Sequence, residues 1–150
     1  MRIMIADSHP EVRAALRLLL EEDSTTWIVV AEAASAIELI NRARSANPRV
    51  ILVDWGLPGM RITPMSTDHQ RLDKVMVALK AIAPKAKVMV LSTSPEVKSA
   101  ALRAGADAFM CKSEPPQQLL AAIKKLEQEL AGEGTPPWSK LPNIPIEPNS

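Results

Sequence analysis

The feature that most constrains this fold is a regular alternation of short apolar runs with amphipathic segments. Five runs, rich in Val and Ile and too short for helices, occupy residues 3–6, 27–31, 50–53, 88–91 and 108–111. Between them, apolar residues recur at helical spacing, for example at Val12, Leu16 and Leu19. Strands that are apolar on both faces and alternate with helices predict an α/β fold, with a parallel sheet covered by helices on both sides.

Length and composition fit one domain followed by an extension. The chain has 150 residues, of which 47% are hydrophobic, and this is enough for one substantial core. The helical pattern ends near Leu130, and Gly132 and Gly134 are expected to follow the last helix. The remaining residues hold many prolines and no usable period. We therefore expect a domain over residues 1–130 and a proline-rich, disordered tail over 131–150.

The charge balance bears on partners and location. Lys and Arg number 18 against 17 Asp and Glu, and no run of basic residues marks a surface for nucleic acid or anionic lipid. The first residues lack the apolar core of a signal peptide, and no stretch approaches the roughly 20 apolar residues of a membrane span. The single cysteine, Cys111, excludes an intrachain disulfide framework. These features predict a cytoplasmic protein with no direct nucleic-acid or membrane partner.

Polar residues end four of the predicted strands. They are Asp7, Asp54, Ser92 and Lys112. In open parallel sheets the ligand crevice lies at the carboxyl ends of the strands. Carboxylates bind Mg²⁺ through oxygen, and a hydroxyl and an ammonium bind phosphoryl oxygens. Each residue alone has a plain structural explanation, since Asp is common in turns. The four together predict a phosphoryl site beside a divalent cation.

Four segments resemble the motif blocks of response-regulator receiver domains of two-component signalling. They are IMIADSHPEVRAALRLLL, VILVDWGLPGM, KVMVLSTSP and ALRAGADAFMCK, in the family's order, and the resemblance covers residues 1 to about 130. It implies a doubly wound, flavodoxin-like sheet of five parallel strands in the order 2-1-3-4-5, with helices on both faces. It also implies a protein that is not an enzyme, apart from self-catalysed phosphotransfer and autodephosphorylation.

The resemblance assigns roles around the acceptor. Asp54 would be the phosphoacceptor, and Lys112 would contact the phosphoryl group. Ser92 would be the hydroxyl switch residue and Phe109 the aromatic one. The carboxylate would attack a phosphohistidine of a partner, while cationic groups stabilise charge on the transferring group.

The metal site departs from the family's pattern. Asp7, Asp54 and the backbone carbonyl of Gly56 would hold Mg²⁺, but Ser8 stands where the family usually has a second acid. Serine is a neutral and weaker ligand, so weak Mg²⁺ binding is expected. A second alignment, which pairs Ala6 with the first acid and Asp7 with the second, keeps the direct ligand but shifts the HP motif by one residue.

Three further departures lie near the expected site. Residues 61–70 resemble an insertion in an unusually long loop, where Asp68 or His69 could replace the missing acid, although a solvated loop is favoured. The spacing between the switch serine and the lysine is shorter than usual. The lysine is followed by Ser113, where the family often has a proline in a cis peptide.

These features predict a receiver that is phosphorylated by a histidine kinase or phosphotransfer protein and signals through protein contacts. The surface for a downstream partner, or for a homodimer, would lie on the predicted fourth helix, fifth strand and fifth helix. The alternative is a pseudo-receiver that is not phosphorylated and serves as a docking or dimerisation module. A flavin-binding domain is disfavoured, because Trp55 is the one aromatic residue placed to stack on a flavin.

Overall fold

The computed structural model describes residues 1–60 and 68–133, apart from the side chains of 68–73 and 133. Strands and helices alternate as the sequence predicts. The strands are β1 (Arg2–Ala6), β2 (Ile28–Ala33), β3 (Val50–Asp54), β4 (Lys87–Ser92) and β5 (Ala108–Cys111). The helices are α1 (Pro10–Asp23), α2 (Ala36–Ala46), α3 (Asp68–Ile82), α4 (Lys98–Arg103) and α5 (Pro116–Glu133), with a short 3₁₀ helix, Pro95–Val97, before α4.

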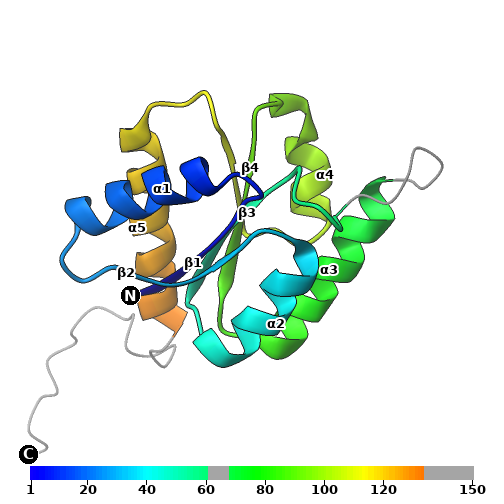
Figure 1. The fold of residues 1–150 in the computed structure, drawn as a ribbon, viewed down its shortest axis with the longest axis horizontal. Coiled ribbons are helices and arrows are strands. Elements are labelled where there is room, and N and C mark those ends of the chain that lie inside the picture. The colour runs from blue at the N-terminus through cyan, green and yellow to red at the C-terminus, as the bar shows by residue number, and fades with distance from the viewer. Residues whose placement is uncertain (61–67, 134–150) are drawn as a thin grey trace, which may run out of the picture.

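The strands form one parallel sheet in the order β2-β1-β3-β4-β5, which confirms the expected order. Helices α1 and α5 cover one face, and α2, α3 and α4 cover the other (Figure 1). This is the doubly wound arrangement, in which each crossover returns a parallel strand to the same sheet. Among the described helices, none combines the length and apolarity that crossing a membrane requires.

Strand residues alternate between two cores, one on each face of the sheet. Ile51 and Val53 of β3 face the cluster under α2, α3 and α4, whereas Val50 and Leu52 face the cluster under α1 and α5. All four side chains are fully buried, and burial of one such side chain contributes about 1.5–3 kcal/mol. The two-sided burial explains why the strands read as continuous apolar runs rather than as an alternating pattern.

The end of α5 differs from the sequence prediction. Gly132 was expected to follow the helix, but α5 continues through it to Glu133. Leu126 and Leu130 are buried on this helix, so packing extends almost to its end. One glycine costs about 1 kcal/mol relative to Ala in a helix, which is too little to end a helix anchored two residues earlier. Residues 134–150, most of the expected tail, lie outside the described residues, as do residues 61–67 of the expected insertion.

Strand register brings the polar strand ends to one edge of the sheet. Ala6 pairs with Val53, and Asp54 pairs with Leu91, so the carboxyl ends of β1, β3 and β4 are level. On the far side of β4, Ser92 pairs with Cys111 of β5. The residues that follow these strands therefore meet above the sheet, at the point where the strand order reverses.

Candidate functional site

The structure brings together Asp7, Asp54 and Lys112, which the sequence places after three different strands. The Lys112 Nζ atom lies 2.8 Å from Asp7 Oδ2 and 2.8 Å from Asp54 Oδ1. The side chains of Lys112, Asp7 and Asp54 are 23%, 2% and 12% exposed. One ammonium thus joins two carboxylates in a mostly buried position, where charge-assisted hydrogen bonds are strong.

Asp7 is also held from its other side. Its Oδ1 atom accepts a hydrogen bond from the His9 backbone N–H at 2.9 Å and lies 3.0 Å from His9 Nδ1. The Asp7 carbonyl accepts from Arg13 Nη1 at 2.6 Å, and the Asp7 N–H donates to the Ala33 carbonyl at 2.9 Å. The contact between His9 and Asp7 was not predicted from the sequence. The signal was the place of His9 at the N-cap of α1, directly before Pro10 and two residues after an acid.

The pKa values of two residues follow from these contacts. Burial raises the pKa of the Asp7 carboxyl, but hydrogen bonds from Lys112 and His9 outweigh burial and hold it below its ordinary value of 3.8. Burial lowers the pKa of Lys112, but hydrogen bonds to Asp54 and Asp7 outweigh burial and hold it above 10.5. At neutral pH the Asp7 carboxylate therefore faces the Lys112 ammonium as an ion pair.

The expected switch residues lie beside this network without joining it. Ser92 is buried, and its Oγ accepts a hydrogen bond from the Ser94 backbone N–H at 3.1 Å. The Ser92 carbonyl accepts from the Lys112 backbone N–H at 2.7 Å, so the serine and the lysine are adjacent across β4 and β5. Phe109 is partly buried on β5 and packs against the core under α2, α3 and α4.

Gly56 allows the chain to pass close to the Asp54 carboxylate. A Cβ atom at this position would lie 3.3 Å from Asp54 Oδ2, closer than is comfortable for most side chains. A glycine here avoids that close contact with the carboxylate oxygen. The loop then turns back at Gly59, where φ is +92°, and the Pro58 carbonyl accepts a hydrogen bond from the Ala36 N–H at 2.8 Å. The loop after β3 is therefore attached to the first turn of α2.

The donor set does not fit a resident Mg²⁺ ion. Ser8 is partly exposed, and its Oγ lies 3.3 Å from His9 Nδ1. Within residues 1–60 and 68–133, no three His, Cys, Asp or Glu side chains form a group that could hold a metal. Three of the four carboxylate oxygens of Asp7 and Asp54 already face His9 or Lys112. Mg²⁺ requires uncommitted anionic oxygens in near-octahedral geometry.

The other departures have structural counterparts. Asp68 and His69 were expected in a loop, but they lie in the first turn of α3. Their side chains lie outside the described residues, so a role as a substitute acid stays a prediction. The short spacing between Ser92 and Lys112 coincides with a short α4, Lys98–Arg103. No peptide bond in the described chain is cis, so Ser113 follows Lys112 through a trans bond.

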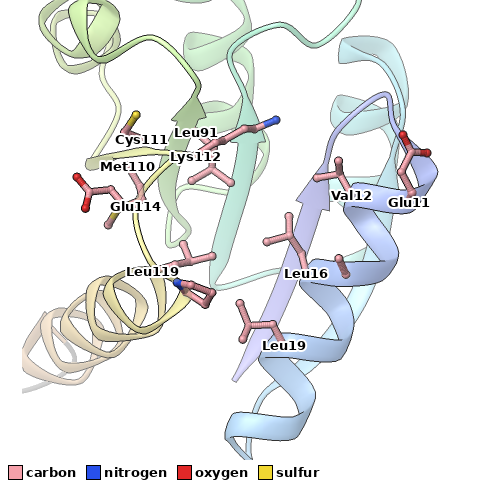
Figure 2. Close-up of a pocket in the computed structure, with 12 residues that line it drawn as sticks. Glu11, Val12, Leu16, Leu19, Leu91, Met110, Cys111, Lys112, Glu114 and Leu119 are labelled. Atoms are coloured by element: carbon pink, nitrogen blue, oxygen red, sulfur yellow. The ribbon is translucent and has the colours of Figure 1, made fainter.

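A cavity of about 580 Å³ adjoins the site between α1 and the start of α5. Its walls are apolar and include Val12, Leu16 and Leu119, whereas Glu11 and Glu114 stand near its rim (Figure 2). Lys112 lines it from the β5 side (Figure 2). Lys112 thus belongs both to the charge network and to the wall of a large, mainly apolar cavity.

Comparison with known proteins agrees with this geometry. The family model of the response regulator receiver domain matches residues 3–124. The chain is 33% identical over 131 residues to the nitrate/nitrite response regulator NarL of Escherichia coli, covering 87% of this chain and 55% of NarL. It is 34% identical over 127 residues to NarP of the same organism, covering 82% of this chain and 53% of NarP. The chain therefore spans about half the length of these curated relatives.

Solved structures share the fold. The isolated receiver domain of RcsB from Salmonella enterica serovar Typhimurium, with the phosphomimetic BeF₃⁻, is 25% identical at a TM-score of 0.69, covering 85% of this chain and 88% of that one. A CheY-like receiver domain protein from Methanospirillum hungatei is 25% identical at a TM-score of 0.68, covering 88% and 97%. The resemblance seen in the sequence motifs is thus confirmed: this chain belongs to the response regulator receiver domain family of two-component signalling.

Proposed function

We propose that this receiver accepts a phosphoryl group on Asp54. The observation that carries the proposal is the Lys112 ammonium, which lies 2.8 Å from Asp54 Oδ1 at the switch point of the sheet. A cation held at the acceptor oxygen is placed to stabilise the charge of an incoming phosphoryl group. The second oxygen of Asp54 faces Gly56, which has no side chain of its own to crowd it.

The transfer needs a nucleophile, a positioned cation and a nitrogen leaving group. An Asp54 carboxylate oxygen forms a bond to phosphorus as the phosphorus–nitrogen bond of a phosphohistidine breaks. The electron pair of that bond stays on the imidazole nitrogen, which takes one proton from solvent water, so that the donor leaves as neutral histidine. The product is an aspartyl phosphate, whose added charge lies next to Lys112. Asp7 holds Lys112 from the opposite side and keeps its ammonium near the acceptor.

The partners follow from this chemistry. The donor is a histidine kinase or a histidine phosphotransfer protein of the cytoplasm, and it must approach the edge that carries the strand ends. The phosphorylated receiver then acts through a downstream protein or a second copy, which we place on α4, β5 and α5. Ser92 and Phe109 are the proposed switch residues, because they adjoin the site on β4 and β5.

The test is intact-protein and peptide mass spectrometry after exposure to a small phosphodonor such as acetyl phosphate. Wild type should gain one phosphoryl adduct on Asp54, and Asp54→Asn should gain none. Asp23→Asn is the matched control, since Asp23 is a surface acid on α1 that pairs with Lys124. An equal adduct in Asp54→Asn would reject the assignment.

One observation favours the second candidate, a pseudo-receiver that docks partners without phosphorylation. Ser8 replaces an acid, and the remaining carboxylates are already paired within the protein. This candidate predicts folded wild type with no adduct from either small donors or a phosphorylated kinase. The same mass spectra therefore separate the two functions.

A further inference from the structure

We propose that the Lys112 ammonium takes the place of the divalent cation in this acceptor site, so that neither the site's geometry nor phosphorylation of Asp54 requires Mg²⁺. Receiver domains generally bind Mg²⁺ at their acidic pocket. The present chain keeps the acceptor and the lysine but has a different donor set. The phosphorylation part of this inference rests on the function proposed above, and the metal-binding part does not.

The first step of the argument is the position of the ammonium. Lys112 Nζ lies 2.8 Å from one oxygen of each carboxylate, Asp7 Oδ2 and Asp54 Oδ1. Both oxygens contact the same nitrogen atom, so a metal ion that bound these two oxygens would have to compete with Nζ for them. Displacement would leave a mostly buried ammonium, only 23% exposed, without its partners. That loss opposes metal binding.

The second step is the charge of the site. Two carboxylates and one ammonium give Asp7, Asp54 and Lys112 a net charge of −1. An acid at position 8 would make it −2 and would place three carboxylates around one ammonium. Like charges at such distances repel strongly in a site of low dielectric constant, and a divalent cation relieves that repulsion. Ser8 removes the third negative charge, so the single ammonium leaves little repulsion for a metal to relieve.

The third step is the orientation of Asp7. A metal ion commonly fixes the carboxylates that bind it, but here His9 contacts Asp7 Oδ1 through its backbone N–H at 2.9 Å and its ring Nδ1 at 3.0 Å. Arg13 fixes the Asp7 carbonyl at 2.6 Å. The carboxylate therefore keeps its direction toward Lys112 through protein contacts alone. Position, charge and orientation all come from the chain's own residues.

The metal-binding test is calorimetric titration of Mg²⁺ into wild type, Ser8→Asp, Lys112→Met and the control Ser99→Asp. Ser99 is an exposed serine of α4, so its substitution adds the same charge away from the site. We expect no saturable binding by wild type or Ser99→Asp. Ser8→Asp adds an anionic oxygen and Lys112→Met frees two, so each should bind at least about tenfold more tightly than wild type. Saturable wild-type binding as tight as that of both variants would overturn the inference.

The phosphorylation test uses the same phosphodonor with excess Mg²⁺ or with a chelator. The wild-type rate of Asp54 labelling should change less than about twofold, and that of Ser8→Asp should fall about tenfold or more on chelation. A wild-type rate that falls as steeply as that of Ser8→Asp overturns the inference while leaving the proposed function intact. If wild type is never labelled, the proposed function fails, and the titration alone decides whether Lys112 replaces the metal. Circular dichroism checks that each variant is folded.

Discussion

Replacement of Lys112 by Met tests the energetic role of the charge network most directly. The methionine keeps most of the apolar length of the side chain but removes the ammonium that lies 2.8 Å from each of two carboxylates. Breaking a buried ion pair by removing one partner costs about 3–5 kcal/mol. Lys112 is 23% exposed, so water partly screens its interactions and brings the expected cost below that range. We expect a loss of about 2–3 kcal/mol in the free energy of unfolding.

The assay is urea unfolding followed by circular dichroism without added divalent cation. A loss of this size is a large part of the total stability of a domain, which is typically about 5–15 kcal/mol. Lys124→Met is the matched control, because Lys124 forms a 3.3 Å surface pair with Asp23 and is 54% exposed. Exposed pairs contribute about 0–1 kcal/mol, so this variant should unfold near the wild-type midpoint.

A double-mutant cycle with Asp54→Asn separates pairing from simple packing. Because Asp54→Asn removes one of the two charges that Lys112 Nζ contacts, the cost of Lys112→Met should fall in that background. Equal losses in Lys112→Met and Lys124→Met would refute the reasoning. So would strict additivity in the cycle, since it would mean that the 2.8 Å contact carries no coupling energy.

Two further predictions concern pH and the loop after β3. Folding lowers the pKa of Asp7, so its contribution to the free energy of unfolding is present above pH 3.8 and is lost as the pH falls through the folded pKa. Folding raises the pKa of Lys112, so its contribution is present below pH 10.5 and is lost as the pH rises through the folded pKa. The stability difference between wild type and Lys112→Met should therefore narrow outside this window in urea titrations, and a constant difference across it would count against the network. Gly59→Ala should lower the free energy of unfolding by about 2 kcal/mol or more, because φ is +92° and the new Cβ would lie 3.0 Å from the Ala36 Cβ. Gly105→Ala should lower it less in the same assay, because φ is +110° there but the new Cβ would meet open space.

The sequence predicted the sheet well because its strands are buried on both faces. The run predicted at 108–111 coincides with β5, and the runs predicted around Val50 and Val88 differ from β3 and β4 by at most one residue at either end. A buried parallel strand leaves a continuous apolar run, which no exposed helix produces. Trp27 shows the limit of this signal. It was placed in the second strand but lies just before β2, where its Nε1 donates to Glu127 of α5 at 3.0 Å.

The candidate site was predictable where its residues end strands and not where they act from a cap or a loop. Asp7, Asp54 and Lys112 could be placed together because parallel strands end at one edge of a sheet. The contact between His9 and Asp7 depends on the geometry of a helix N-terminus, which residue spacing does not specify. The hydrogen bond from the Ser94 backbone N–H to Ser92 Oγ is likewise a local turn contact. A serine at position 92 does not by itself specify this bond, because it depends on the conformation of the turn.

The long sequence separation within the charge network has a consequence for how the chain folds. The hydrogen bond from Lys112 to Asp7 joins residues 105 positions apart, and it forms only when β5 has added at one edge of the sheet, beyond β3 and β4 as counted from β1. Contacts of such range are among the slowest to form, because the intervening chain must be ordered first. Until the last strand docks, the two carboxylates lack their ammonium. If Asp54 accepts a phosphoryl group as proposed above, that ability should therefore arise only in the final stage of folding.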